Sequence, residues 1–499
     1  MKHTATTHTS YLVGLTAAPV TITATFDGAH DAASADHRRF AGLSERHARE
    51  AGVRVRAALQ RHLSTEHYNR CHKVRVTVSG ADQAHSAAAF DLAIAVAVAQ
   101  AATVQEDTAF LDQDLVRTVP VLLLGELSLV GHVRVVRGVI SHLEAARDRG
   151  YHWAVVPVHS DREAAMVTGM DVRAGGTLGD VLQHLQGGAP LSKVVHVPPR
   201  PGPCVPDMAD VRGLAGAVRA LEVAAAGGHN VLLRGAPGAG KTILARRLTG
   251  ILPPCNDDEQ LSIQRVISAA GMGLSSGSRP FRAPHHTASL AALLGSAQTP
   301  GEVSLATHGV LFLDELTEWR GATLEGLARV LRQGKVTCRQ DRGLAVIDLP
   351  ANPQLLVGAM TPCPCGFLGV HRGNRAACVC TPEMVQRHQD RVFKSPLFSL
   401  FDIVVDVCTP TQSQRAMAPP TCTSAEIRER VVAARDGAPG RQHGAGHRGG
   451  LLLPNAVIRR EEVARTIAAL DGRAGQPPSA ADYTEAEGLE PRRWSGVWS

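Results

Sequence analysis

The first part of the chain alternates between two spacings of apolar residues. Over 20–26 and 74–78 every second residue is apolar, which predicts strands with one buried face, whereas longer apolar stretches predict helices. Together these elements predict an α+β or α/β domain over residues 1–186. The predicted strands are 20–26, 74–78, 121–125, 132–136 and 154–158, and the predicted helices are 46–63, 90–102 and 139–149.

A proline-rich stretch then interrupts the pattern. Residues 187–209 begin with two tandem glycines and carry six prolines, so no helix or central strand can run through them, and we interpret them as a linker. Past the linker, an apolar strand at 231–233 runs into a glycine-rich turn and a helix at 242–249. This order of strand, phosphate loop and helix predicts a nucleotide-binding domain, which we place at 210–420.

The C-terminal part is predicted to be helical. Thr423 and Glu426 have the spacing of a capping box before a helix at 427–435, and a further helix is predicted at 458–470. The glycine- and histidine-rich stretch between the two helices is interpreted as a loop. The residues after Asp471 are weakly patterned.

Length, charge and cysteine content narrow the class of protein. A chain of 499 residues is too long for one hydrophobic core and predicts two or three domains. The excess of 52 basic over 46 acidic residues permits nucleic-acid binding without requiring it. Ten scattered cysteines lack the density of a disulfide framework and fit a reducing compartment. The N-terminus is polar and the longest apolar run, 87–102, is too short to span a membrane, so we expect a cytoplasmic protein with no membrane partner.

One segment matches the phosphate-binding pattern G-x-x-x-x-G-K-[ST]. Its glycines let backbone N–H groups turn toward phosphate, Lys241 supplies charge for the β- and γ-phosphates, and the Thr242 hydroxyl suits Mg²⁺. The strand before it and the helix after it are the context that the pattern needs, so ATP and Mg²⁺ are the expected ligands. The matching residues are Gly235, Ala236, Pro237, Gly238, Ala239, Gly240, Lys241 and Thr242.

An apolar strand further along the chain ends in two acids, Asp314 and Glu315. Acids at the carboxyl end of a buried strand lie at the sheet edge where ligands bind. We expect Asp314 to hold Mg²⁺, directly or through water, and Glu315 to polarise the attacking water.

Two further clusters are less specific. Adjacent histidines, His285 and His286, would point to opposite faces of a strand, so a structural or subunit-contact role is favoured over metal binding. A basic stretch around a predicted turn at 333–335 is either a projecting hairpin that contacts a nucleic-acid backbone or a solvated face. Its cations are Arg329, Arg332, Lys335, Arg339 and Arg342.

Four cysteines occur as two close pairs, Cys363 with Cys365 and Cys378 with Cys380. Four thiolates in such pairs suit a tetrahedral Zn²⁺. Because the usual zinc spacing is C-x-x-C rather than C-x-C, four ordinary reduced cysteines are an equal alternative.

These motifs resemble those of the magnesium-chelatase-like AAA+ ATPases of the ComM/YifB family. The resemblance covers most of the chain and is weaker before the linker. The segments that carry it are 210–213, 224–230, the phosphate loop, 279–289, 300–305, 309–316 and 360–366.

The resemblance implies a hexameric ring ATPase and, for ComM-like members, a motor that moves branched DNA in recombination or transformation. It also implies an N-terminal domain similar to the Lon protease fold at 1–186 and a small helical lid, shortened here, at 421–499. Around Ala88 and Ile140 the chain lacks the Ser and Lys of a proteolytic relative, so no peptidase activity is expected.

Three departures from the family pattern bear on activity. The sensor Asn of the family is Thr361 here, whose hydroxyl can still orient water. The arginine that would reach a neighbouring subunit's γ-phosphate aligns with Leu400, and Arg391 or Lys394 are weak substitutes. The sensor Arg of the lid falls near Asn455.

Three hypotheses follow. The leading one is an ATP-driven motor acting on branched DNA, in which Lys241, Asp314, Glu315 and Thr361 are catalytic. The second is a weakly hydrolysing, ATP-binding ring component, which Leu400 favours. The third is a chelatase-type ATPase subunit that acts on a partner protein.

Overall fold

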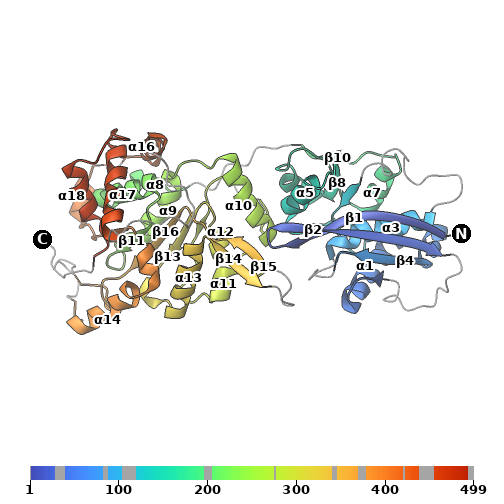
Figure 1. Cartoon of the computed structure of the whole chain (residues 1–499), viewed down its shortest axis with the longest axis horizontal. Coiled ribbons are helices and arrows are strands. Elements are labelled where there is room, and N and C mark those ends of the chain that lie inside the picture. Colours follow the sequence, from blue (N-terminus) through green and yellow to red (C-terminus); the bar gives the residue numbers. More distant parts are fainter. Residues whose placement is uncertain are drawn as a thin grey trace. The chain divides into compact units, whose positions relative to one another are not determined.

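The chain forms two compact units of mixed α/β structure (Figure 1), as the sequence predicts for the fold class. Unit 1 comprises Met1–Pro199, Gln264–Ser275 and Ala297–Thr299, and unit 2 comprises Arg200–Ile263, Ser276–Ser296 and Pro300–Ser499. The computed structural model describes residues 2–27, 40–81, 88–103, 120–195, 205–274, 277–339, 346–368, 378–419, 422–437 and 455–492. Residues 196–204 of the predicted linker, Arg342 and most of the predicted loop after the helix at 427–435 lie outside this description.

Unit 1 is built on an eight-stranded mixed sheet of order β10-β9-β8-β5-β1-β2-β4-β3. Its longest strands form an antiparallel pair, and β2 buries Val20, Ile22 and Ala24 on one face, as predicted. The first strand of the pair was not predicted, because its residues are mostly polar. The strands are β1 Lys2–Val13, β2 Thr16–Asp27, β3 Phe40–Ala41, β4 Val74–Ser79, β5 Val121–Leu123, β8 Trp153–Pro157, β9 Asp171–Gly175 and β10 Ser192–Lys193.

Helix α3 (Asp91–Thr103) is the centre of the unit 1 core, since all of its residues are buried. The Asp91 carboxylate accepts two hydrogen bonds from the Arg54 guanidinium, at 2.6 and 3.1 Å, which offsets the cost of burying it. The remaining elements of this unit are α1 Glu45–His62, α2 Thr65–Cys71, a short hairpin of β6 Glu126–Leu127 and β7 Val133–Arg134, α5 Val139–Arg147, α6 Asp161–Ala164 and α7 Leu178–Leu185.

Residues 264–275 belong to unit 1 although they follow the phosphate loop in sequence. Arg265 donates two hydrogen bonds of 2.8 Å to Glu144, and Ser268 Oγ donates to the buried Glu163 at 2.5 Å. These contacts explain why this part of helix α10 (Asp257–Ala270) packs with the N-terminal unit.

Unit 2 contains a parallel five-stranded sheet of order β12-β13-β16-β11-β17. Its three central strands are buried along their whole length, as expected when helices cover both faces of a parallel sheet. Because the strands are parallel, the segments that follow them meet at one edge. The strands are β11 Val231–Arg234, β12 Phe281–Arg282, β13 Val310–Leu313, β16 Leu355–Met360 and β17 Ile403–Asp406.

The connections of unit 2 are mostly helical. A two-stranded hairpin of β14 (Lys335–Arg339) and β15 (Val346–Pro350) interrupts them. The helices are α8 Ala215–Gly227, α9 Lys241–Ile251, α11 Leu290–Leu294, α12 Glu302–Leu305, α13 Gly321–Gln333, α14 Pro382–Phe393 and α15 Gln412–Met417.

The three C-terminal helices, α16 (Ser424–Gly437), α17 (Asn455–Leu470) and α18 (Ala480–Gly488), gather beside α8 (Figure 1). The predicted capping box precedes α16: Thr423 N–H donates to Glu426 at 2.7 Å and Glu426 N–H to Thr423 Oγ1 at 3.2 Å. Helix α18 was not predicted.

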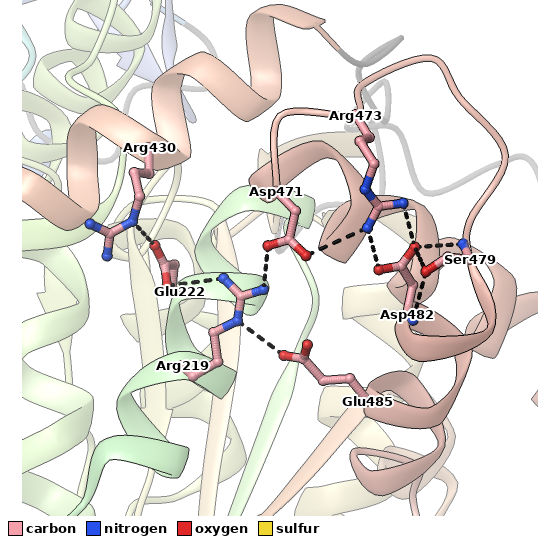
Figure 2. Close-up of polar contacts among 8 residues, drawn as sticks. All are labelled: Arg219, Glu222, Arg430, Asp471, Arg473, Ser479, Asp482 and Glu485. Carbon is pink, nitrogen blue, oxygen red and sulfur yellow. Dashed lines mark hydrogen bonds and ion pairs between the residues drawn. The ribbon is translucent and has the colours of Figure 1, made fainter.

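Polar contacts also tie these helices to α8. Arg219 of α8 points toward Asp471 and Glu485, and Arg430 of α16 points toward Glu222 (Figure 2). The structure therefore joins the C-terminal helices to the nucleotide-binding unit by charge pairs as well as by apolar packing.

Among the residues that the structure describes, no helix has both the length and the apolar composition needed to cross a bilayer.

Candidate functional site

The phosphate-loop motif lies between β11 and α9, as predicted. Gly238 and Gly240 have φ of 75° and 105°, values that glycine tolerates and other residues avoid, so the backbone can direct its N–H groups inward. The Nζ of Lys241 donates to the carbonyl oxygens of Gly235 and Ala236 at 2.7 and 2.9 Å. The lysine is thus folded over its own loop, where a phosphate can take the place of these carbonyls.

The predicted acids follow β13 and meet the phosphate loop. Thr242 Oγ1 donates to Asp314 Oδ2 at 2.9 Å, and Trp319 Nε1 donates to the Asp314 carbonyl oxygen at 2.8 Å. Burial lowers the pKa of Lys241, and the charges of Asp314 and Glu315 oppose that shift. A hydroxyl, an ammonium and two carboxylates therefore lie at the same edge of the sheet, and a triphosphate with its Mg²⁺ requires groups of these kinds.

Thr361 follows β16, the strand between β11 and β13, so it reaches the same sheet edge. Its Oγ1 lies 3.1 Å from Nε2 of His388, a buried residue of α14. Burial lowers the pKa of His388, although a hydrogen bond with the Thr361 backbone and the charge of Glu318 oppose the shift. The partner His388 was missed by the sequence reasoning, because no motif joins the two segments.

The histidine pair does not lie on a strand, as the sequence reasoning assumed, and the favoured structural or subunit-contact role stays a prediction. Strand β12 ends at Arg282, so His285 and His286 lie in the turn beyond it, and their rings are 4.1 Å apart instead of on opposite faces. His286 Nδ1 lies 2.9 Å from Oε2 of Glu315. This contact joins the ends of two different strands, so residue spacing carried no signal for it.

The four paired cysteines come together. Their Sγ atoms all lie within 4.8 Å of one another, and Cys378 is 3.8 Å from Cys363 and 3.5 Å from Cys365. Around a zinc ion with Zn–S bonds of about 2.3 Å, tetrahedral geometry requires sulfur atoms about 3.8 Å apart. The thiols thus have a spacing that could hold a metal ion, and both zinc binding and four ordinary reduced cysteines stay predictions.

The electrostatics of the thiols are uneven. Burial raises the pKa of Cys363. Partial burial also acts to raise the pKa of Cys365, but the backbone N–H of Phe367 and the neighbouring thiols outweigh it and lower the pKa to about 6. Cys365 therefore ionises more readily than Cys363.

The thiol cluster adjoins the phosphate loop through Gly366. This glycine has a φ of +79°, and a Cβ built on it would lie 2.5 Å from Cδ of Pro237. Only a residue without a side chain permits this approach.

The predicted basic stretch spans the end of α13 and the first strand of the β14–β15 hairpin. The turn predicted at 333–335 is the end of α13, with Gly334 at φ 68°, and the hairpin follows it. Lys335 pairs with Asp348 at 2.6 Å, whereas Arg329 and Arg339 are exposed. Arg332 is exposed as well and donates to the carbonyl oxygen of Pro396. A nucleic-acid contact and a solvated face both stay predictions.

Leu400 ends a short 3₁₀ helix, Pro396–Leu400, and is half-buried. The two residues considered as replacements for the arginine expected at Leu400 have partners within unit 2. Arg391 donates to the carbonyl oxygen of Thr317 at 3.0 Å, and Lys394 pairs with Asp390 at 2.8 Å.

Comparison with known proteins agrees with this architecture. The family described as "Magnesium chelatase, subunit ChlI" matches residues 207–416, and the family described as "Subunit ChlI of Mg-chelatase" matches residues 32–160.

Similar proteins share about a third of their residues with the chain. Competence protein ComM of Haemophilus influenzae is 36% identical and the match covers 79% of this chain and 76% of that protein. The uncharacterized protein YifB of Escherichia coli is 34% identical over 86% and 81% of the two chains, and an uncharacterized protein of Mycobacterium tuberculosis is 35% identical over 84% and 81%. The chain therefore belongs to the magnesium-chelatase-like family of AAA+ ATPases that includes the ComM and YifB proteins.

Proposed function

We propose that this protein is a cytoplasmic, ring-forming ATPase that couples ATP hydrolysis to movement of branched DNA, in recombination or transformation. The observation that carries the proposal is the meeting of the phosphate loop, Asp314, Glu315 and Thr361 at one sheet edge. The DNA substrate is suggested by one relative, a competence protein, and by the exposed cations of α13 and the hairpin.

Each residue at this edge has a task in hydrolysis. The backbone of the phosphate loop binds the β- and γ-phosphates, and Lys241 leaves its two carbonyl partners to neutralise them. Glu315 accepts a hydrogen bond from the attacking water and takes its proton, while the hydroxyl of Thr361 orients that water. The new bond joins the water oxygen to the γ-phosphorus, and the bond to the leaving ADP breaks.

The residues present fit a magnesium ion. The Thr242 hydroxyl and the Asp314 carboxylate lie 2.9 Å apart at the carboxyl edge of the sheet, and both are oxygen donors of the kind that Mg²⁺ prefers. When bound, the ion neutralises charge on the phosphate oxygens.

We also propose that Cys363, Cys365, Cys378 and Cys380 hold a structural zinc ion. The spacing of their sulfur atoms supports the proposal, and the Gly366 contact with Pro237 links the site to the phosphate loop. The ion would supply no catalytic step.

The domain assignments follow the same reasoning. We propose a Lon-like domain without peptidase activity at 1–186, a linker at 187–209 in which Ser192–Lys193 forms the edge strand β10, an AAA+ domain at 210–420 from which residues 264–275 and 297–299 pack in unit 1, and a shortened helical lid at 421–499. Ala88 and the buried Ile140 support the absence of a serine–lysine pair at those positions.

The test is ATP turnover with no DNA, with a linear duplex and with a four-way junction of the same composition. We expect the junction to stimulate turnover most. Lys241→Ala should lose ATP binding, whereas Glu315→Gln should bind ATP and lose hydrolysis. Turnover that is indifferent to every DNA, or a Lys241→Ala variant as active as the wild type, would contradict the proposal.

A second candidate function is an ATP-binding ring component that hydrolyses slowly. Leu400 favours it, because an arginine acting across subunits is worth about 10³ to 10⁵ in rate. ATP-dependent assembly with almost no turnover, measured by light scattering beside the turnover assay, would select this candidate. A chelatase-type role instead requires a partner protein that co-purifies with the chain.

A further inference from the structure

We propose that His286 is a positioning residue for Glu315: it sets the direction of the carboxylate that acts on the attacking water. The inference rests on the proposed ATP hydrolysis. It adds a residue that belongs to neither the phosphate loop nor the acid pair.

The backbone at Glu315 is fixed, but its side chain needs a further contact. Glu315 has a φ of 50°, its N–H donates to Asp314 Oδ1 at 2.9 Å, and its carbonyl accepts from Glu318 N–H at 2.8 Å. The side chain is 59% exposed, and within the described residues its ion-pair partner is His286. An exposed glutamate has several side-chain rotamers, so this one contact decides where the carboxylate points.

His286 is suited to that task because the segment before it is anchored. Arg279 is buried and contacts Glu259 at 2.8 Å, and Arg282 donates two hydrogen bonds of 2.7 Å to Glu302. The His286 side chain itself is 25% exposed, so it is held more firmly than the carboxylate that it contacts. A rigid donor against a mobile acceptor is the arrangement that positions a catalytic group.

The contact with His286 involves only one oxygen of Glu315, so the carboxylate can still act as a base. Nδ1 of His286 faces Oε2, so this nitrogen carries the proton of the hydrogen bond. The second oxygen, Oε1, is left to accept from water. The histidine thus holds the carboxylate in place without taking up its proton-accepting capacity.

The neighbouring histidine supplies a matched control. His285 stacks near His286 but directs its Nδ1 to Thr287 Oγ1 at 2.8 Å. Replacing His285 removes a ring of equal size from the same turn and leaves the contact with Glu315.

The experiment compares His286→Ala, His286→Asn and His285→Ala in the full chain. For each, it measures kcat and KM for ATP with the junction, affinity for a non-hydrolysable ATP analogue, and thermal unfolding. We expect His286→Ala to lower kcat about tenfold or more with analogue affinity unchanged, because a misdirected base affects the chemical step alone. Asn places a donor where Nδ1 stood, so His286→Asn should recover most of kcat, and His285→Ala should resemble the wild type.

The outcomes separate this inference from the proposed function. If the wild type hydrolyses ATP and His286→Ala keeps its kcat, the positioning role is wrong and the proposed function stands. Equal losses of kcat, affinity and thermal stability in both alanine variants would also overturn it, because they indicate a structural role for the turn. A wild type without any turnover overturns both.

Discussion

Arg219 is the residue whose removal should loosen the C-terminal helices most. It donates to Glu485 and Asp471 at 3.0 Å each, and it lies 3.4 Å from Glu222, whose side chain is 5% exposed (Figure 2). Asp471 and Glu485 are 44% and 35% exposed, so water can replace the arginine there. Glu222 cannot be hydrated in this way and would keep Arg430 as its partner, at 2.6 Å.

The magnitude of Arg219→Ala follows from these exposures. The two solvent-exposed pairs contribute about 0.5 kcal/mol each. Loss of one of two partners of the buried Glu222 costs about 1 to 2 kcal/mol, because its charge stays desolvated. The sum, about 2 to 3 kcal/mol, corresponds to a roughly 30- to 150-fold rise in the local opening constant of the helices.

Hydrogen exchange read by mass spectrometry measures this opening in peptides from α16 and α18. The control is Arg465→Ala, which removes an exposed pair with Glu461 on α17 and should change exchange by about 0.5 kcal/mol or less. Adding Glu222→Gln to Arg219→Ala should recover part of the loss, because the buried charge that has lost one of its two partners disappears. Exchange in α18 that matches the control variant would refute the reasoning.

Three further predictions concern other parts of the chain. Gly366→Ala should weaken ATP binding about tenfold, because the added Cβ would meet Pro237. The control Gly475→Ala, at a similar positive φ but with nothing within 4 Å, should leave ATP binding unchanged, and titration with a labelled nucleotide measures both variants. A strong chelator should release about one zinc per chain, measured by a colorimetric zinc assay, and Cys378→Ser should reduce the zinc content, whereas Cys71→Ser should not. Burial raises the pKa of Glu163 above its ordinary value of 4.5, although the hydrogen bond from Ser268 acts to lower it. The folded state therefore binds a proton more tightly than the unfolded state does, and it loses stability as pH rises through the folded pKa. Glu163→Gln should therefore raise the unfolding temperature at neutral pH and lose this advantage near pH 4, and equal shifts at both pH values would contradict the reasoning.

The parts of the fold with strong apolar patterns could be predicted from the sequence. Strand β1 could not, because buried residues on both of its faces carry hydroxyls, among them Thr7 and Ser10. Thr7 Oγ1 donates to the carbonyl oxygen of Ala93 at 2.9 Å, and Ser10 Oγ lies 2.6 Å from His142 Nδ1. Hydrogen bonds to distant helices make these polar residues compatible with the core, and no local pattern contains that information.

Helix α18 was missed for a different reason. It has few apolar residues, and its buried Asp482 is paired with Arg473 at 2.6 Å. A local signal did exist, since Ser479 and Asp482 form a capping box. Helix α18 lacks the apolar pattern on which the helix predictions rested. Its capping box and its ion pair stabilise it instead.

The residues of the candidate site also differ in whether a local sequence signal predicts them. Residues within one motif, such as Lys241 and Thr242, could be assigned from spacing, because a phosphate loop is local in sequence. The four cysteines could also be grouped from their two close pairs, but two contacts between separate segments could not be predicted: His286 with Glu315 and His388 with Thr361.

The parallel sheet explains why such distant segments converge on a nucleotide. Every crossover returns the chain to the same edge, so each segment that leaves β11, β13 and β16 can add a side chain to one site. The segment after β16 does more than that: it carries Thr361, then two of the thiols, and then Gly366 against Pro237. We therefore expect a change at the thiols to disturb the phosphate loop, because Gly366 lies close against Pro237.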